Sequence, residues 1–462
     1  MIKKIFPYRL QLQIFQLDEY VPGKFLKWIS AHLFTRTIEN KKPLVMTQKA
    51  KSIYYLAILL SLIDIFILTL FFKFSGFIIS LILATQAYIF ILIAYLFLFP
   101  LDIYRKNQVK RQTEEKILSL KKKNLKVIGI TGSYGKTSVK EFLYQILRTE
   151  HSVLRTPESY NTPYGIAKVV DLELDDSYKY FICEMGAYRI GEIKEICDMV
   201  HPKYGVLTGI NEQHLETFGS LENTTKTKFE LIESLPENGF GIINIDNPHI
   251  KNNYLKYNKK LIPYGFTDEK FSLKNITHHT SGSEFILVLD GKEYHTRTRL
   301  LGKPNIQNIL AAATMSFLLG IKPQSIVNTI AELKPVPHRL EIKKLEELTI
   351  IDDAYNSNVN GFKEAIVLLE TFKEPKILVT PGIVDLGNQT LPIHKELGKI
   401  LDKIDYIFLV GTSERTKGLQ EGIAQKNKII EIDSIKQFRK KISELHLNHP
   451  VVLLENDLPD SY

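Results

Sequence analysis

The sequence predicts an α/β protein with three parts: a two-helix transmembrane hairpin, a P-loop domain built on a parallel sheet, and a smaller Rossmann-like C-terminal domain. Three observations predict this order. Two apolar runs, each of about twenty residues, stand near the N-terminus. A glycine-rich stretch ends in Gly-Lys-Thr at 135–137, and strand patterns alternate with helix patterns from residue 127 onwards.

The hairpin is predicted for residues 53–99. Its apolar runs, 53–72 and 77–99, are each long enough to cross a hydrocarbon core, and a tight break at 73–76 separates them. Residues 1–52 lack the cleavage site of a signal peptide and are expected to be cytosolic. Basic residues lie on both outer flanks, namely Lys41, Lys42, Lys49 and Lys51 before the first run and Arg105, Lys106, Lys110 and Arg111 after the second. The pattern predicts a multi-pass protein of the cell membrane whose following domains are cytoplasmic.

Two buried helices of a soluble core are the alternative for these runs, but two consecutive runs of this length favour the membrane. Asp64 lies inside the first run. A carboxylate at this depth is a functional candidate. We expect it instead to pair with Gln86 or to lie near a helix crossing.

Composition limits the function classes. The chain has 462 residues and a net charge of +9, enough length for two or three domains with hydrophobic cores. Much of the basic excess flanks the apolar runs, and no aromatic-basic motif of the RNA-binding kind occurs, so no nucleic-acid partner is expected. The only two cysteines, Cys183 and Cys197, exclude a disulfide framework and favour a reducing compartment.

Domain boundaries after the hairpin follow from shifts in pattern. We expect a basic helical stalk at 100–124, a central domain at 125–336 and a C-terminal domain at 337–462, with the hinge at 335–337. Strands of the buried type are predicted at 127–130, 178–183, 204–207 and 241–245 in the central domain, and at 349–351, 376–380, 406–410 and 451–454 in the C-terminal domain. Helices between them predict mostly parallel sheets.

The stretch 129–137 reads G-x-T-G-x-x-G-K-T between a predicted strand and a predicted helix. Gly132 and Gly135 would let backbone N–H groups approach phosphate oxygens at a helix N-terminus. Lys136 would place a positive charge on the outer phosphates, and the Thr137 hydroxyl can hold Mg²⁺. The stretch therefore predicts a site for a nucleoside triphosphate, rather than a plain glycine-rich turn.

Two polar groups follow predicted strand ends. Glu184 comes directly after the strand at 178–183, and His214 follows the strand at 204–207, so both are expected at the sheet edge where α/β proteins bind ligands. They offer an oxygen and a nitrogen to a divalent metal such as Mg²⁺. The stretch 225–230 is predicted to open a helix with Lys228 in its first turn. Singly, these residues have ordinary structural explanations; in this order after the P-loop they indicate one site.

Taken together, the motifs resemble the Mur ligases, the ATP-dependent amide-forming enzymes of cell-wall peptide synthesis, and most closely the MurF type that adds D-alanyl-D-alanine. The resemblance covers roughly residues 125–462. It rests on the stretches at 129–137, 159–165, 184–187 (EMGA), 211–220 (NEQHLETFGS), 227–230, 302–308, 338–341 (HRLE) and 352–358 (DDAYNSN). MurF-type enzymes open with a soluble domain for a uridine nucleotide, and here the membrane hairpin takes its place.

The resemblance implies a role for each motif residue. Catalytic roles are expected for Lys136, Lys228, His214 and Arg339; metal ligation for Thr137, Glu184, His214 and Lys228; and nucleotide binding for Gly132, Gly135, Lys136, Thr137, Ser138, Asn308, Arg339 and Asp353. Asn308 would contact adenine, Arg339 the γ-phosphate and Asp353 the ribose. Lys228 matches the lysine that the family carbamylates with CO₂, which would let it hold a second Mg²⁺.

The implied function is an ATP- and Mg²⁺-dependent carboxylate–amine ligase that acts through an acyl phosphate. Its partners would be a nucleotide- or lipid-linked cell-wall (peptidoglycan) precursor and an amino acid or a D-Ala-D-Ala-like dipeptide, with the protein a monomer. Three alternatives stay open: a ligase of the folylpolyglutamate or cyanophycin kind on the same core, a membrane ATPase or transporter component, and an inactive scaffold. ADP release that depends on an added amine separates ligase from ATPase.

Overall fold

The computed structural model describes residues 7–18, 20–32, 44–158, 160–211, 215–279, 282–355, 358–384 and 386–456, with the side chains of 215 and 216 left out. It divides into two compact units, Met1–Val109 and Lys110–Tyr462. Helix α5 (Ala87–Lys122) contributes to both units.

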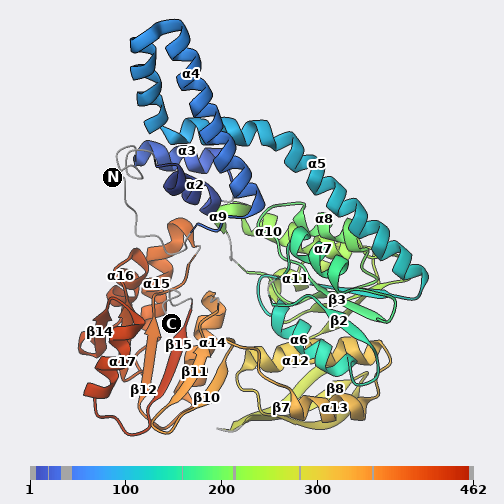
Figure 1. Ribbon diagram of the computed structural model, residues 1–462. Coiled ribbons are helices and arrows are strands. Elements are labelled where there is room, and N and C mark those ends of the chain that lie inside the picture. Colours follow the sequence, from blue (N-terminus) through green and yellow to red (C-terminus); the bar gives the residue numbers. More distant parts are fainter. Residues whose placement is uncertain are drawn as a thin grey trace. The chain divides into compact units, whose positions relative to one another are not determined.

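The N-terminal unit is a helical hairpin with two short helices, α2 (Tyr8–Leu17) and α3 (Pro22–Ala31), packed at its base. Helix α4 (Gln48–Thr85) folds back on itself (Figure 1), and the non-helical backbone of Lys73 (φ 52°, ψ −133°) marks the reversal. A Cβ added to Gly76 would lie 1.9 Å from the backbone oxygen of Leu68, so the limbs touch backbone to backbone there. The predicted break at 73–76 is therefore confirmed.

The hairpin presents large apolar side chains on its outside. Phe66, Phe71 and Phe74 are 70%, 73% and 75% exposed. By length and composition alone, α4 and α5 are each long and apolar enough to cross a membrane. A continuous apolar surface of this kind is rare on soluble proteins. The expected pair between Asp64 and Gln86 is not formed within the described part of the chain, where Gln86 Nε2 donates to Thr85 Oγ1 at 3.5 Å.

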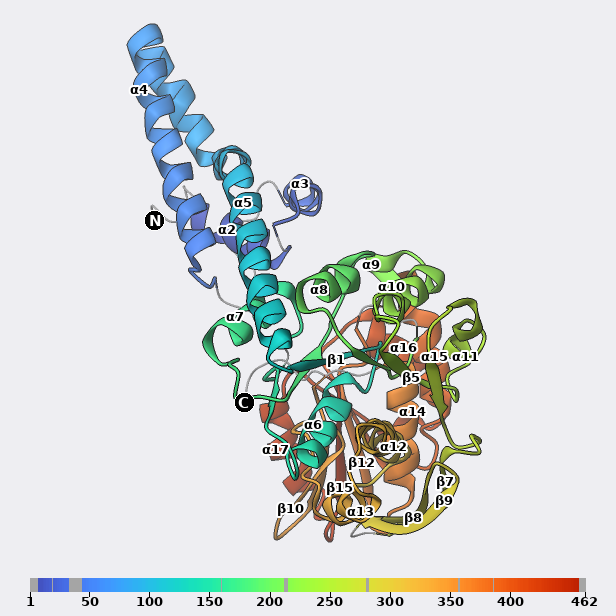
Figure 2. The ribbon, with the colours of Figure 1, turned by 90° about the vertical axis from the view of Figure 1, so that its right-hand side faces the viewer.

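The central domain contains a six-stranded parallel sheet of order β2-β3-β1-β4-β5-β6. Its strands are β1 (Lys126–Thr131), β2 (Val153–Arg155), β3 (Tyr180–Glu184), β4 (Tyr204–Leu207), β5 (Phe240–Asn244) and β6 (Leu261–Tyr264). Helices α6 (Lys136–Leu147) and α12 (Lys303–Leu318) cover one face, and α8 (Glu192–Val200) and α10 (Leu221–Glu233) cover the other, as Figure 2 shows. Helix α13 (Pro323–Glu332) packs on α6 and α12. The predicted parallel sheet is confirmed.

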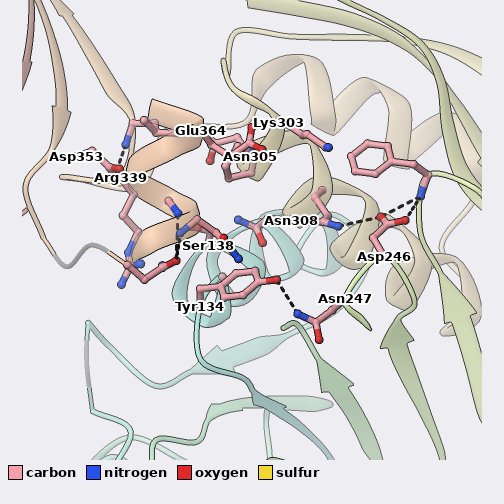
Figure 3. A pocket seen from close by; sticks show the side chains of 18 of the residues that line it. Tyr134, Ser138, Asp246, Asn247, Lys303, Asn305, Asn308, Arg339, Asp353 and Glu364 are labelled. Carbon is pink, nitrogen blue, oxygen red and sulfur yellow. Dashed lines mark hydrogen bonds between the residues drawn. The ribbon is translucent and has the colours of Figure 1, made fainter. Parts of the chain in front are cut away.

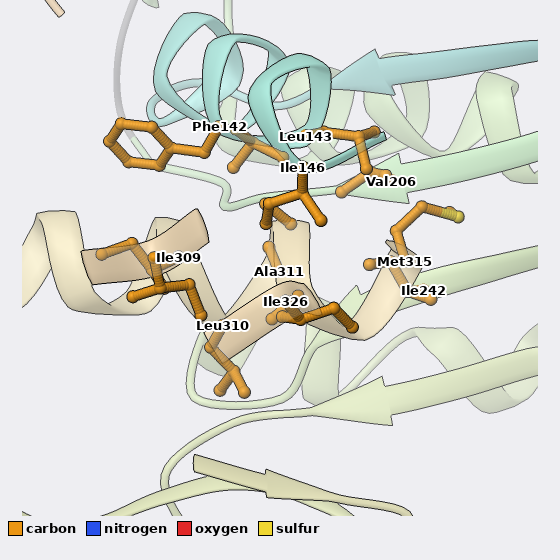
Figure 4. Packing of buried hydrophobic residues seen from close by; sticks show 14 of the residues in the cluster. Phe142, Leu143, Ile146, Val206, Ile242, Ile309, Leu310, Ala311, Met315 and Ile326 are labelled. Atoms are coloured by element: carbon orange, nitrogen blue, oxygen red, sulfur yellow. The ribbon is translucent and has the colours of Figure 1, made fainter. Parts of the chain in front are cut away.

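Packing between α6 and α12 forms the core that holds the P-loop in place (Figure 4). Phe142, Leu143 and Ile146 recur along one face of α6 and are fully buried. They meet Leu310 and neighbouring residues of α12. Burial of side chains of this size contributes about 1.5–3 kcal/mol each. An antiparallel sheet of β7 (Phe271–His279), β8 (Gly282–Leu289) and β9 (Lys292–Thr298) extends the same core.

The C-terminal domain has a second six-stranded sheet, ordered β10-β11-β15-β12-β13-β14, in which only β10 is antiparallel. The strands are β10 (Glu341–Lys344), β11 (Thr349–Asp353), β12 (Lys376–Thr380), β13 (Tyr406–Val410), β14 (Ile429–Ile432) and β15 (Val451–Glu455). Helices α14 (Val359–Glu370), α15 (Thr390–Lys399) and α16 (Glu414–Gly422) cover one face and α17 (Ile435–Glu444) the other. The predicted Rossmann-like domain is confirmed.

The last turns of α5 pack on the central domain. Thr113, Ile117 and Leu120, spaced along one helix face, are buried there. Polar contacts flank this stripe: a hydrogen bond of 2.8 Å between His201 Nε2 and Glu114 Oε1, and ion pairs of Lys123 with Asp176 at 2.8 Å and of Lys110 with Glu195. The predicted stalk at 100–124 is thus divided, and its second half belongs to the second compact unit, Lys110–Tyr462.

Candidate active site

The phosphate-binding loop runs from the end of β1 to the start of α6. Gly132 and Gly135 have φ angles of 152° and 78°, which residues other than glycine rarely adopt. A Cβ on Gly132 would lie 2.1 Å from Thr208 Oγ1, and one on Gly135 would lie 2.5 Å from Asn308 Oδ1. Both conformation and space therefore require glycine. The resulting concave backbone at a helix N-terminus is suited to an anion.

Lys136 is the first residue of α6, and its side chain folds back over the loop. Its Nζ donates to the backbone oxygens of Gly132 at 2.8 Å and Ser133 at 3.4 Å. Burial lowers the pKa of Lys136 to about 8; the charge of Glu184 opposes this shift and that of Arg339 adds to it. A bound polyphosphate would favour the charged ammonium, because opposite charges at short range stabilise each other.

Glu184 ends β3, beside β1, and is 2% exposed. Its Oε1 accepts from Thr137 Oγ1 and Asn161 Nδ2, both at 3.2 Å. Its Oε2 lies 3.1 Å from Lys140 Nζ but accepts no hydrogen bond of good geometry. Burial alone would raise the pKa of Glu184, but the charges of Lys140 and Lys136 outweigh burial and lower it. An ionised carboxylate whose Oε1 lies beside the Thr137 hydroxyl fits Mg²⁺.

Arg339 comes from the C-terminal domain and reaches the P-loop. Its Nη2 donates to Thr137 Oγ1 at 3.2 Å, and its guanidinium lies 4.7 Å from the centre of the Tyr355 ring. The residues on either side, His338 and Leu340, have φ angles of 60° and 50°. Such strained non-glycine conformations cluster at functional sites. Here they direct Arg339 towards Thr137, so the two domains share one site.

A cavity of about 330 Å³ lies between the P-loop and the C-terminal domain (Figure 3). Its lining includes Gly135, Ser138, Asn308, Arg339 and Asp353, which the sequence had assigned to the nucleotide. The structure therefore brings these residues together. Asp353 accepts the backbone N–H of Leu340 at 3.1 Å, and burial raises the pKa of Asp353 to about 7.

The sequence analysis missed several residues of this cavity. Tyr134, Asp246 and Asn247 line it, and Asn247 Nδ2 donates to the Tyr134 hydroxyl at 3.1 Å. Asp246 accepts from Gln307 Nε2 at 2.9 Å. A signal for two of them was present, since Asp246 and Asn247 follow the strand β5, whose carboxyl end lies at the same sheet edge as the P-loop.

Lys228 is buried, but its predicted place at the start of a helix is wrong. Helix α10 begins at Leu221, because Ser220 caps it by accepting the N–H of Asn223 at 3.2 Å, and Lys228 follows two turns later. Burial, together with the nearby charge of Lys136, lowers the pKa of Lys228 to about 7. Lys228 therefore lies within electrostatic reach of Lys136 in the P-loop.

Predicted site residues are not all covered by the structure. His214 lies outside the described residues, as do Ser159, Asn356 and Ser357 of the quoted motifs. Of the rest, Lys136, Thr137, Glu184 and Arg339 are joined by direct contacts or charge interactions. These contacts bring a cation of the C-terminal domain, Arg339, to the P-loop residues of the central domain.

Comparison with known proteins gives two family matches: the Mur ligase middle domain over residues 130–316 and the Mur ligase, glutamate ligase domain over 338–454. Three curated relatives are each named UDP-N-acetylmuramoyl-tripeptide--D-alanyl-D-alanine ligase. That of Bacillus subtilis is 33% identical over 62% of this chain and 63% of its own length. Those of Buchnera aphidicola (strain APS) and Escherichia coli are 35% and 32% identical, each over 65% of this chain and 68% of the relative. The chain thus spans about two thirds of the length of these relatives.

Solved structures give the same fold. A MurF ligase from Thermotoga maritima in complex with ADP has a TM-score of 0.69 and 24% identity, covering 76% of this chain and 80% of that one. A MurF from Acinetobacter baumannii has a TM-score of 0.69 and 23% identity, covering 77% and 78%. The resemblance read from the motifs is confirmed, and with 35% identity over 68% of a curated relative, the chain belongs to the Mur ligase family.

Proposed function

We propose that this protein is an ATP-dependent ligase that joins the carboxylate of a peptidoglycan precursor to the amine of a D-Ala-D-Ala-like dipeptide or an amino acid. The observation that carries the proposal is the contact between Arg339 and Thr137, through which the C-terminal domain supplies a cation to the P-loop. The ligase activity of the curated relatives, as their names give it, supports the reaction class, and the ADP in the Thermotoga maritima structure supports the nucleotide.

Phosphoryl transfer is the first chemical step. The precursor carboxylate attacks the γ-phosphorus of ATP, the bond to the β–γ bridging oxygen breaks, and ADP leaves. Negative charge spreads over the transferring oxygens, and Lys136 and Arg339 stabilise it from the P-loop and from the second domain. Asn308 and Asp353, which line the same cavity, are proposed to orient the adenine and the ribose.

Amide formation follows. The neutral amine attacks the acyl carbon, a tetrahedral intermediate forms, the nitrogen gives up a proton to the departing phosphate, and phosphate leaves with the electrons of the C–O bond. Water would hydrolyse an acyl phosphate, so the site must exclude it. Arg339 reaches Thr137 only when the C-terminal domain lies over the P-loop, and we propose that the same arrangement closes the cavity to water.

Magnesium would be held by Glu184 and Thr137, whose oxygens already lie 3.2 Å apart, with His214 and Lys228 as further proposed ligands. When bound, it would neutralise charge on the phosphate oxygens. Lys228 is proposed to react with CO₂: Nζ forms a bond to the carbon and loses a proton, which leaves an anionic carbamate. Its burial and lowered pKa support this, because only the neutral amine is nucleophilic.

The hairpin is proposed to anchor the protein in the cell membrane with both flanks in the cytoplasm. Residues 48–72 of α4 rise about 37 Å at 1.5 Å per residue, more than the roughly 30 Å of a hydrocarbon core. Lys49 and Asp102 form an ion pair of 2.7 Å, which pairs two charges on the flanks of the apolar limbs. Lys73, at the reversal, would lie outside.

Labelling tests this topology. Both native cysteines are buried, so a Lys73→Cys variant offers one accessible thiol at the reversal, and Lys106→Cys offers one on the cytoplasmic flank. A membrane-impermeant maleimide added to intact cells is expected to label the first variant and spare the second. Labelling of both or of Lys106→Cys alone contradicts the topology.

Activity is tested with the full-length protein in detergent or vesicles. UDP-N-acetylmuramoyl-tripeptide and its lipid-linked counterpart serve as acceptors, with D-alanyl-D-alanine as the amine. ADP release is expected only when acceptor and amine are both present. Release without either would identify an ATPase, and release with glutamate and a folate acceptor would identify the folylpolyglutamate type.

A further inference from the structure

Lys140 lies one turn after Lys136 in α6, and its side chain is completely buried. Lysines are almost never fully buried unless they are paired. Its Nζ donates to the backbone oxygen of Glu158 at 2.6 Å and lies 3.1 Å from Glu184 Oε2. A third contact, to Glu141 Oε1, is 3.6 Å long. Among the described residues, Lys140 is not part of the cavity lining, so it acts through the groups that it touches.

The backbone at Glu158 is strained, with φ at 39°. Non-glycine residues rarely adopt this region, and such conformations persist only where the surroundings hold them. Lys140 holds the carbonyl of this residue. Three positions later, Asn161 Nδ2 donates to Glu184 Oε1 at 3.2 Å, and the Asn161 carbonyl accepts the N–H of Gly186 at 2.8 Å. The turn at Glu158 therefore sets the position of one hydrogen-bond donor to Glu184.

Glu184 is thus held from several elements. Its own N–H donates to Thr156 Oγ1 at 3.1 Å, Asn161 binds Oε1, and Lys140 lies against Oε2. The fit around Asn161 is close, since a Cβ added to Gly186 would lie 2.8 Å from the Asn161 side chain. Lys140 touches both the carboxylate of Glu184 and the backbone of Glu158, three residues before Asn161.

We propose that Lys140 is a positioning residue for the divalent metal: it fixes Glu184 Oε2 and the turn at Glu158, so that the carboxylate faces Thr137 in the orientation the metal needs. This rests on the proposed role of Glu184 as a metal ligand. Groups that orient metal ligands typically change metal affinity by 10–100-fold when removed. Loss of the ammonium would free the carboxylate to rotate and would release the strained turn.

Metal binding is measured without the ligase reaction, using Mn²⁺ as the probe in the presence of ADP and the full-length protein. Lys140→Met is expected to weaken Mn²⁺ binding by 10–100-fold, while ADP binding in the presence of a chelator changes less than twofold. Lys140→Gln keeps a hydrogen-bond donor but removes the charge, and it is expected to bind Mn²⁺ with an intermediate affinity.

Val139→Ala is the matched control, since Val139 is the preceding residue of α6 and is fully buried. Val139→Ala is expected to lower the melting temperature and to leave Mn²⁺ affinity unchanged. If Lys140 were purely structural, the Lys140 variants would show this same result. Wild-type Mn²⁺ affinity in both Lys140 variants, or equal weakening in Val139→Ala, overturns the proposal. Wild-type affinity in Glu184→Gln overturns the metal assignment itself, and the role of Lys140 with it.

Discussion

Replacing Lys228 by alanine removes a buried amine that is neutral far more often than an ordinary lysine. With a pKa of about 7, roughly half of the Lys228 side chains are neutral at pH 7, against roughly one in three thousand for a lysine at its ordinary value of 10.5. Only the neutral amine can bond to CO₂, so the environment raises the reactive fraction by about three orders of magnitude. Carbamylation also exchanges a cation that repels Lys136 for an anion that attracts it.

We expect Lys228→Ala to lower amine-dependent ADP release by a factor on the order of 10² or more, since the lost carbamate would no longer hold a metal at the transferring phosphate. Formate or acetate is expected to restore part of the rate, because a free carboxylate offers the same oxygens to the metal. Removal of CO₂ from the buffer should slow the wild type and leave the variant unchanged.

Lys226 supplies the control. It lies in the same helix, two residues earlier, and its side chain is exposed. Lys226→Ala is expected to keep nearly the full rate. Equal loss of activity in both variants would refute a carbamate on Lys228. Rescue of Lys228→Ala by small amines but not by carboxylates would refute it as well, because Lys228 would then act as an ordinary phosphate-binding cation.

Three further predictions concern the rest of the catalytic unit. Lys136→Ala should lower turnover by about 10²–10³-fold with little change in melting temperature, since a half-buried ammonium at a phosphate contributes to the transition state more than to packing; a normal rate of ADP release contradicts this. A chain lacking residues 1–104 should fold and bind ADP. A chain lacking residues 1–122 should have a free energy of unfolding in urea that is lower by about 3 kcal/mol or more, because it loses the buried Ile117 and Leu120. Equal stability of the two chains would show that the end of α5 does not stabilise the central domain. Burial raises the pKa of Asp353 from 3.8 to about 7, so the folded state keeps a proton that the unfolded chain loses. The contribution of Asp353 to the free energy of unfolding is therefore fully present below about pH 4 and is lost as the pH rises towards 7. Urea midpoints of the wild type should therefore decrease as the pH rises from 5 to about 7.5, and Asp353→Asn should remove this dependence on pH. If the variant keeps the same dependence, another group causes it.

Much of the site could be read from sequence because its residues follow strand ends. Glu184 ends β3 directly, and the P-loop follows β1, so strand pattern and parallel topology together predict that they meet. The reversal at Lys73 was equally visible, as a break between two apolar runs. The start of α10 was predicted too late in the sequence. The residues that follow the capping Ser220 are mostly polar, so the helical spacing of apolar residues is absent there.

Other features depend on contacts between distant segments. Lys140 follows the P-loop by three residues and reads as a solvated helix lysine; only the fold brings Glu158 and Glu184 against it. The stripe of Ile117 and Leu120 was visible as a helical pattern, but the surface that covers it lies on the central domain. Tertiary burial of this kind decides the role of a charged side chain, and no local pattern shows it.

The central claim is that the precursor carboxylate is phosphorylated before the amine attacks. An acceptor whose carboxylate carries ¹⁸O at both oxygens is incubated with ATP, Mg²⁺, D-alanyl-D-alanine and the full-length protein. An acyl phosphate transfers one carboxylate oxygen to phosphorus, so each phosphate released should contain one ¹⁸O atom. Inorganic phosphate free of ¹⁸O, formed together with the amide product, would contradict it.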